Sequence, residues 1–308
     1  MNDIKRILVT GSSGTIGTRL CQLLLGEGYE VTGVDRKPNK WSGQVNNLTI
    51  IGDLTDRKVL DNLPGNLDLV IHLAANARVY ELVKNPNLAR DNFETLFNVM
   101  EFARRNKIKR VFFSSSREVY GNSDKIIHNE DESYVRNCES PYTATKIGGE
   151  ALVHAYQMCY GIDFVILRFS NVYGMYDESD RVVPLFIRLT KENKDLVVYG
   201  KDKLLDFTYI DDAVGGIIRA IKIFEKTKND TYNLSSGEGT TLIEIAQMIR
   251  LMMGGKNQIK DSKSRTGEII RFVADLTKAK ILLGYEPKIK VQEGIKRSTE
   301  WYTKTIWK

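Results

Sequence analysis

The chain begins with a short apolar run that ends in three evenly spaced glycines. Residues 6–10 (RILVT) are typical of a buried strand, and Gly11, Gly14 and Gly17 follow at the start of a helical pattern that covers 14–27. Glycine at such a junction permits a tight turn and close contact between strand and helix. The feature therefore predicts that the chain opens with a strand, a sharp turn and a helix packed back onto that strand.

The same alternation of strand and helix continues to about residue 170. Further apolar runs cover 30–34, 48–51, 67–73, 110–114 and 163–169, with helical patterns around 86–105 and 141–160. Later patterns predict helices at 183–193, 211–225, 241–253 and 291–304 and a strand at 231–235. Strands that are apolar throughout are typical of a parallel sheet covered on both faces, and the alternation predicts a doubly wound α/β fold. We expect a Rossmann-like domain of residues 1–169 plus 205–235. A smaller, mostly C-terminal α/β lobe of residues 170–204 plus 236–308 would complete the molecule.

Charge and cysteine content narrow the class of protein. The 308 residues include 45 basic and 39 acidic side chains, for a net charge of +6. Because the basic residues are spread along the chain and form no stripe, nucleic-acid binding is not expected. No apolar run is long enough to cross a bilayer, and the start does not resemble an export signal. Cys21, Cys138 and Cys159 lack the spacing of metal ligands, and so few cysteines favour a reducing compartment, the cytoplasm.

An acidic residue completes the glycine pattern. The first helix would offer its free N–H groups and positive dipole end to phosphates, and Asp35 stands at the end of the second strand. A carboxylate there accepts both ribose hydroxyls and repels a 2′-phosphate, so NAD is favoured over NADP, although Arg36 weakens that choice. Asp53 and Leu54 are expected near the adenine, with capping of the next helix as the alternative for Asp53. The other candidate cofactor contacts are Thr15, Ile16, Leu73, Ala74, Ala75, Asn92 and Ser114, together with Tyr142 and Lys146.

The helix predicted at 141–160 carries a phenol and an ammonium on one side. Tyr142 and Lys146 lie four residues apart, so a helix stacks their side chains. The charge of Lys146 would lower the pKa of Tyr142 and make it a base for a sugar hydroxyl whose carbon loses hydride. Ser116, at the end of the run FFSSS, is the candidate donor to the reacting oxygen. The pair Gly148-Gly149 would let this helix approach a neighbour closely.

With these residues in place, the chain resembles the extended short-chain dehydrogenase/reductase superfamily. More narrowly it is similar to the NAD-dependent nucleotide-sugar epimerase/dehydratase family, and to its UDP-glucose 4-epimerase-like members. The resemblance extends from ILVTGSSGTIG to GEIIRFVADLTKAKILLGYEP and GIKRSTEWY. It implies that Ser116, Tyr142 and Lys146 are catalytic and that the smaller lobe binds a nucleotide sugar, with UDP favoured. It also implies a homodimer formed through the helices at 89–105 and 141–160.

The resemblance assigns roles to several residues of the substrate side. Asn171 in RFSNVYG and Arg265 in SRTGEI would meet the diphosphate, and Glu268 the nucleotide ribose. Val183 is a further candidate substrate contact, and Asn92 matches a structural asparagine beneath the active site. Many relatives carry an arginine where this chain has Leu205. One phosphate clamp is thus missing or replaced, with Lys203 as the candidate replacement.

The residues after Ser116 depart from the usual epimerase pattern. Glu118 resembles the glutamate of 4,6-dehydratases and uronic acid decarboxylases, whereas Arg117 fits neither group and would either pair with Glu118 or meet an anionic sugar such as a uronate. We favour a UDP-hexose 4-epimerase that acts through a transient 4-keto sugar. Dehydration of a nucleotide sugar with Glu118 acting at C5–C6, or the reaction of a uronate-modifying relative that uses Glu118, is the alternative. A non-catalytic NAD-sensing protein is a third interpretation, disfavoured because Tyr142 and Lys146 are both present.

Overall fold

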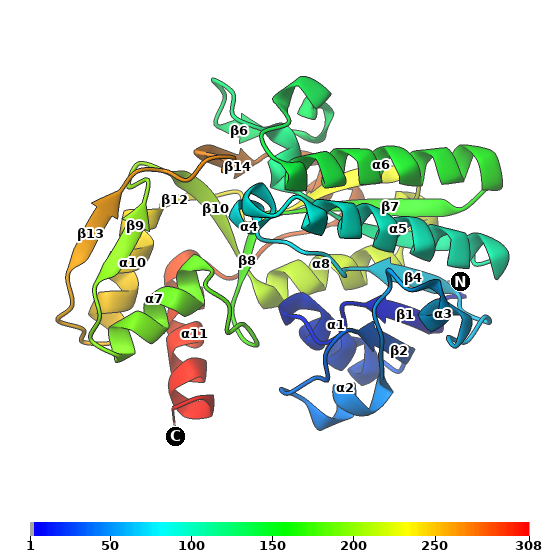
Figure 1. The fold of residues 1–308 in the computed structure, drawn as a ribbon, viewed down its shortest axis with the longest axis horizontal. Coiled ribbons are helices and arrows are strands. Elements are labelled where there is room, and N and C mark those ends of the chain that lie inside the picture. The colour runs from blue at the N-terminus through cyan, green and yellow to red at the C-terminus, as the bar shows by residue number, and fades with distance from the viewer. Residues whose placement is uncertain (1–2, 308) are drawn as a thin grey trace.

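A parallel sheet of seven strands forms the centre of the larger part of the molecule (Figure 1). The computed structural model describes residues 3–307. The strands lie side by side in the order β3-β2-β1-β4-β5-β7-β11, and every neighbouring pair is parallel. Their bounds are β1 Arg6–Thr10, β2 Glu30–Asp35, β3 Thr49–Ile51, β4 Leu69–His72, β5 Arg110–Ser116, β7 Asp163–Phe169 and β11 Asp230–Leu234. Most of these strands are buried along their length, as expected for a sheet covered on both faces.

Helices cover both faces of this sheet. One face carries α1 (Thr15–Gly26) and α8 (Ile210–Lys222), which pack against each other, and the other carries α5 (Asn87–Arg105) and α6 (Pro141–Tyr160). The short helices are α2 Gly43–Leu48, α3 Arg57–Asp61, α4 Val79–Lys84 and α9 Phe224–Thr227. The order of the strands reverses between β1 and β4, and in such sheets ligands bind beyond the carboxyl ends of the strands at that point.

Local signals explain where α6 begins and ends. The hydroxyl of Ser140 accepts a hydrogen bond from the Thr143 N–H (3.1 Å) and caps the helix. Pro141 occupies the first turn, where its missing N–H has no consequence. Gly161 ends the helix in the left-handed region, with a φ of 62°. These signals place Tyr142 in the first turn, beside the carboxyl end of β5.

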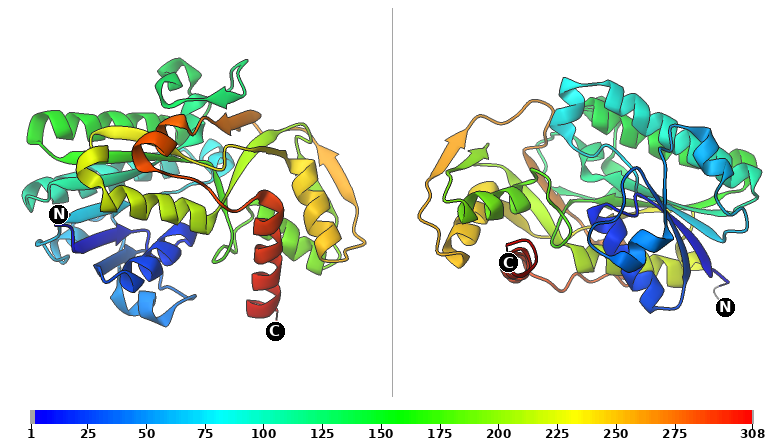
Figure 2. Two further views of the ribbon diagram at one scale, coloured as in Figure 1. Left: turned by 180° about the vertical axis from the view of Figure 1, so that it is seen from behind. Right: turned by 60° about the horizontal axis from the view of Figure 1, so that its bottom comes forward.

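A second lobe extends from one end of the central sheet (Figures 1 and 2). It contains strands in the order β12-β10-β14-β6, with β8 paired to β10, and a separate pair of β13 and β9. The strand bounds are β6 Ile127–His128, β8 Asn171–Tyr173, β9 Leu196–Tyr199, β10 Leu204–Tyr209, β12 Gly239–Thr241, β13 Ile259–Ser262 and β14 Arg271–Ala274. Its helices are α7 Val182–Lys191, α10 Leu242–Met252 and α11 Val291–Thr305, and α11 is the last helix in chain order. Short helical turns complete the fold at η1 Arg117–Tyr120, η2 Glu130–Glu132, η3 Val135–Asn137 and η4 Ala279–Leu283.

The predicted fold class, a doubly wound parallel sheet with a second lobe, is confirmed. The expected domain boundaries stay a prediction; β10 and β6 both pair with strands of the second lobe although they lie in ranges assigned to the first. On α5, Phe93 and Phe97 are about two-fifths exposed on one helix face, and the homodimer expected through α5 and α6 likewise stays a prediction. Within residues 3–307, none of the helices combines the length and hydropathy that a membrane crossing requires.

Candidate active site

The turn after β1 has a geometry that only glycine allows. Gly11 has a φ of 73°, and a Cβ on it would lie 2.9 Å from the Ala74 nitrogen. A Cβ on Gly17 would lie 2.0 Å from the Gly11 oxygen, which excludes any side chain there. The backbone of the turn thus lies close to β4, and the first N–H groups of α1 lie at the helix end where anions bind. These features fit the pyrophosphate of a dinucleotide.

Asp35 is fixed by main-chain groups at the end of β2. Its Oδ2 accepts from the Ser13 N–H and its Oδ1 from the Lys37 N–H, both at 3.0 Å. Arg36 turns toward other partners, because its Nη2 donates to Asn76 Oδ1 (3.0 Å) and its Nη1 lies 3.9 Å from Asp53 Oδ2. The carboxylate of Asp35 is therefore held ready to accept ribose hydroxyls, as expected for NAD.

A cavity of about 170 Å³ lies between this turn, the ends of β2 and β4, and α5. Ten of the predicted cofactor residues line it: Gly11, Gly14, Asp35, Arg36, Asp53, Leu54, Leu73, Ala74, Ala75 and Asn92. The sequence reasoning missed six others: Val34, Gly52, Thr55, Asn76, Asp91 and Thr95. Five of them adjoin a residue that was named, and Thr95 follows Asn92 by one turn of α5, so sequence adjacency and the expected period of that helix were the available signals.

The remaining predicted cofactor contacts lie outside this cavity. The hydroxyl of Thr15 donates to the Tyr176 carbonyl (3.0 Å), Ile16 packs against the main core, and Gly17 lies beneath the turn.

Asp53 accepts from the Thr55 N–H and hydroxyl (3.0 and 2.9 Å), while Asp56 caps α3. The alternative role of Asp53 as the cap of that helix is therefore wrong.

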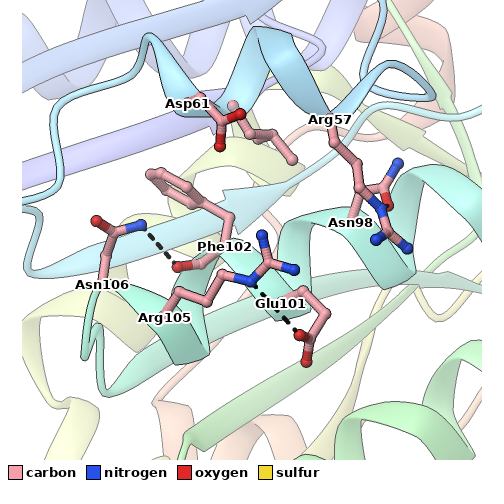
Figure 3. Close-up of a pocket in the computed structure, with 8 residues that line it drawn as sticks. Arg57, Asp61, Asn98, Glu101, Phe102, Arg105 and Asn106 are labelled. Carbon is pink, nitrogen blue, oxygen red and sulfur yellow. Dashed lines mark hydrogen bonds and ion pairs between the residues drawn. The ribbon is translucent and has the colours of Figure 1, made fainter.

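A second cavity, of about 30 Å³, lies between α3 and α5 and shares no residue with the first (Figure 3). Several of its polar groups are already engaged: Asn106 donates to the Phe102 carbonyl (3.0 Å), and Arg105 Nε lies 3.7 Å from Glu101. The volume is about that of a single water molecule. It is too small for a substrate or cofactor.

Ser116 and Tyr142 meet at the carboxyl end of β5. The Ser116 side chain acts on the Tyr142 phenol and lowers its pKa, and both residues are buried. Lys146, one turn further along α6, is 4% exposed and donates from Nζ to the Ser114 carbonyl at 2.7 Å. The same Nζ lies 5.6 Å from the centre of the Tyr142 ring. The structure thus brings the predicted serine, tyrosine and lysine together.

The pKa of Tyr142 moves in the direction opposite to the one expected from the sequence. Burial raises it to about 12, and Ser116 and the guanidiniums of Arg181 and Arg117 oppose this only in part. Burial also lowers the pKa of Lys146 to about 8. The ammonium is directed at the Ser114 carbonyl, so the expected effect of Lys146 on the phenol is outweighed by loss of solvent. A further positive charge beside Tyr142 is needed to make it a base near neutral pH.

The two glycines after Lys146 let α6 approach both of its neighbours. A Cβ on Gly148 would lie 2.7 Å from the ring of Phe93 on α5. A Cβ on Gly149 would lie 2.5 Å from the ring of Phe113 on β5. The close approach expected for this pair is confirmed, and it presses the helix of Tyr142 and Lys146 onto the strand that carries Ser116.

A buried ion pair between Arg168 and Glu150 holds the end of β5 through Ser115. Arg168 donates from Nε and Nη2 to the two oxygens of Glu150 (2.9 and 2.7 Å), and Ser115 donates to Glu150 Oε1 (2.5 Å). Arg168 also donates to the Tyr120 hydroxyl (3.1 Å) in η1. Sequence reasoning missed Glu150, although it follows Lys146 by one turn of the same helix.

Asn92 has a similar supporting role, because it exchanges two hydrogen bonds with the backbone of Asn76 (2.7 and 3.0 Å).

Arg117 and Glu118 form an ion pair in η1, directly after Ser116. Arg117 Nη2 lies 3.0 Å from Glu118 Oε1 and donates to Asn171 Oδ1 at 3.2 Å. Asn171 in turn donates to the Asp206 carbonyl (3.0 Å), so it orients Arg117 from β8. Burial raises the pKa of Glu118, and the Arg117 guanidinium opposes that rise. The pairing that the sequence left as one of two options for Arg117 is thus present.

The other predicted substrate residues lie on the second lobe. Lys203 is 3% exposed and pairs with Glu268 (Nζ to Oε2, 2.5 Å). The guanidinium of Arg265 lies between two rings, 4.1 Å from the centre of Tyr199 and 5.1 Å from that of Tyr80 on α4. Val183 is buried in α7 within the main core, and Leu205 is buried in β10.

Comparison with known proteins agrees with this geometry. Residues 7–235 match the model of the NAD dependent epimerase/dehydratase family. The chain belongs to this family. The resemblance inferred from the motifs is therefore confirmed, and so is the expectation of an NAD-dependent family of enzymes.

Individual relatives of the chain span nearly its whole length. It is 31% identical to a putative UDP-glucose 4-epimerase of Methanocaldococcus jannaschii, over 96% of this chain and 97% of that protein. It is 30% identical to a UDP-glucuronate 4-epimerase of Thermodesulfobacterium geofontis, over 97% of this chain and 96% of that protein. The crystal structure of a UDP-glucose 4-epimerase with UDP-glucose from Thermotoga maritima superposes with a TM-score of 0.88 and 28% identity, over 98% and 99% of the two chains. These relatives act on sugars with different substituents at C6, so they leave the sugar open.

Proposed function

We propose that this chain is an NAD-dependent UDP-hexose 4-epimerase. The observation that carries the proposal is the buried group of Ser116 and Tyr142, with Lys146 one helical turn away, at the edge of the sheet that also holds the glycine turn. Tyr142 takes the proton of the C4 hydroxyl while Ser116 holds the oxygen. C4 also loses hydride, which gives the 4-keto sugar; this sugar turns over, and Tyr142 returns the proton when hydride comes back to the other face.

Bound NAD would supply a hydride acceptor and, when oxidised, a positive charge beside Tyr142. That charge would add to those of Arg181 and Arg117, which lower the pKa of Tyr142 but leave it at about 12 against the effect of burial. Gly11, Gly14 and Asp35 would hold the cofactor. Hydride is removed and returned within one cycle, so no external electron acceptor is consumed.

The ion pair in η1 favours epimerisation over dehydration. A glutamate that removes a proton from C5 must offer a free carboxylate oxygen at the right place. Here Arg117 Nη2 holds Glu118 Oε1 at 3.0 Å and opposes the rise in the pKa of Glu118 that burial causes. Dehydration stays the second candidate because the other oxygen of Glu118 lacks a hydrogen-bond partner within residues 3–307.

Product analysis with UDP-glucose tests the proposal. We expect NMR to show the C4 epimer at unchanged mass, whereas dehydration would remove one water. Tyr142→Phe should lower turnover by about 10²–10⁴-fold while the protein keeps its NAD. Tyr160→Phe, at the half-exposed end of the same helix, is the matched control and should leave turnover unchanged. Equal activity of wild type and Tyr142→Phe would reject the proposed role of the phenol.

A further inference from the structure

Among the residues that the structure describes, the ion pair of Arg117 and Glu118 leaves one atom of each residue without a hydrogen-bond partner, and we call these two atoms its free edge. Arg117 Nη2 and Glu118 Oε1 face each other, and Asn171 holds the same Nη2 from β8. Among the residues that the structure describes, Arg117 Nη1 and Glu118 Oε2 are buried and have no hydrogen-bond partner. Glu118 is 3% exposed, so solvent does not compensate for the missing bonds. Buried polar atoms are almost always paired, and exceptions of this kind call for an explanation.

The position of this edge connects it to the reacting sugar. η1 starts at the residue after Ser116, the candidate partner of the reacting oxygen. The charges of Arg117 and Glu118 both act on the Tyr142 hydroxyl, Glu118 raising its pKa and Arg117 lowering it. In a hexopyranose, C4 is bonded to C5, and C5 carries C6. The C6 group is therefore the substituent next to the reacting carbon that differs between hexoses and hexuronates.

The two unpartnered atoms require different hydrogen-bonding groups of a ligand. Arg117 Nη1 can only donate, because a guanidinium has no acceptor and stays charged. Glu118 Oε2, next to that permanent charge, accepts as a carboxylate oxygen. A hydroxyl group accepts from the first and donates to the second. A carboxylate can only accept, and the negative charge of Glu118 would repel it.

We infer that the free edge of the Arg117–Glu118 pair contacts the group at C6 of the sugar and selects a neutral hydroxyl over a carboxylate. This inference rests on the proposed function, because it places the sugar by the reaction at C4. The substrate class is then a UDP-hexose with a C6 hydroxyl, and Glu118 is the residue that excludes UDP-hexuronates. Asn171 is a positioning residue for Arg117.

Binding measurements on the NAD-loaded protein test the inference directly. Titration calorimetry with UDP-glucose and UDP-glucuronate should show tighter binding of UDP-glucose by wild type, about ten-fold or more. In Glu118→Gln the carboxylate becomes an amide whose N–H donates beside Arg117. We expect the ratio of affinities to move toward UDP-glucuronate by about ten-fold or more, through loss of repulsion and gain of a donor.

A matched variant separates this effect from a general change of charge. Glu139→Gln removes the same charge from an exposed residue whose field also reaches Glu118. It should leave the ratio of the two affinities unchanged. Arg117→Lys keeps the charge but loses the second donor edge, so it should weaken UDP-glucose binding without improving UDP-glucuronate binding. The NAD content of each variant shows that it is folded.

Several outcomes would overturn the inference. These are tighter binding of UDP-glucuronate by wild type, an unchanged ratio in Glu118→Gln, or equal shifts in Glu118→Gln and Glu139→Gln. Turnover is measured separately by NMR on both sugars. The expected binding preference without any epimer formed would support the selective edge and reject the proposed reaction. Epimer formation without the preference would do the reverse.

Discussion

At the cofactor end of the site the main chain does most of the positioning, whereas at the sugar end charged side chains hold one another. Gly11 and Gly17 bring backbone against backbone, and two N–H groups fix the carboxylate of Asp35. On the other side, Arg117 pairs with Glu118 in η1. The pair of Lys203 and Glu268, from the second lobe, acts on the same carboxyl of Glu118.

The cofactor end and the sugar end of the site are expected to respond differently to substitutions. A backbone turn has one conformation, so an added atom must displace the chain. A pair of side chains can exchange its partner for a group of the substrate, and a single substitution changes what the pair accepts. We therefore expect substitutions at the cofactor end to destabilise the fold and to abolish NAD binding together. Changes at the sugar end should alter affinity and selectivity in a folded protein.

Gly17→Ala should produce the largest effect. Its Cβ would lie 2.0 Å from the Gly11 carbonyl oxygen, a main-chain atom that cannot move aside alone. We expect the free energy of unfolding to fall by about 3 kcal/mol or more. NAD should be lost because the turn and the start of α1 are displaced. Urea denaturation and the absorbance of released NAD measure the two losses.

Gly26→Ala is the control within the same helix. No atom lies within 4 Å of a Cβ at Gly26, so the substitution meets open space. Alanine there should be neutral or raise the free energy of unfolding by about 0.5–1 kcal/mol. If Gly17→Ala were as stable as Gly26→Ala and kept its NAD, the account of the cofactor end would be wrong.

Features that depend on local pattern could be predicted from the sequence. The central sheet, its main helices and the glycine turn follow from apolar runs, helical periods and Gly11, Gly14 and Gly17. The short helices α2, α3 and α4 were missed because five or six residues carry no clear period. The smaller strands of the second lobe were missed for the same reason.

Features that depend on where side chains point could not be predicted. Helical spacing puts Lys146 beside Tyr142, but only the fold shows that its ammonium turns to the Ser114 carbonyl and that both groups are buried. The direction of the pKa of Tyr142 followed from that burial. The pair of Lys203 and Glu268 joins residues 65 apart in sequence, and no local pattern indicates it.

Lys203→Met should produce an intermediate effect at the sugar end. The substitution removes a buried cation and leaves Glu268 without its partner, so the negative diphosphate of UDP meets less positive charge. We expect UDP to bind about ten-fold more weakly, which corresponds to about 1.4 kcal/mol. NAD content should be unchanged, in contrast to Gly17→Ala. Titration of the purified protein with UDP measures the loss.

Lys201→Met is the control for that change. Lys201 lies two residues away, is largely exposed and faces Asp261 at 3.8 Å. Removal of this charge should change UDP affinity little, because solvent screens exposed charges. Equal losses in the two variants would show that the total charge of the lobe, and not the buried position of Lys203, determines binding.

The smallest expected effect is a dependence of sugar selectivity on pH. Burial raises the pKa of Glu118, Glu268 and Glu139 raise it further, and Arg117 and Lys203 lower it. A raised pKa means that Glu118 gains its proton at a higher pH than an ordinary glutamate does as the solution is acidified.

Protonated Glu118 would donate from the free edge and would no longer repel a carboxylate. The affinity for UDP-glucuronate relative to UDP-glucose should therefore rise a few-fold between neutral and mildly acidic pH in wild type. Because both sugars carry the same diphosphate, its titration cancels in the ratio of the two affinities. Glu118→Gln has no proton to gain, so its ratio should stay flat over the same range. If the ratio of the two affinities stayed constant in wild type, or rose equally in the variant, the charge of Glu118 would not determine which C6 group is bound.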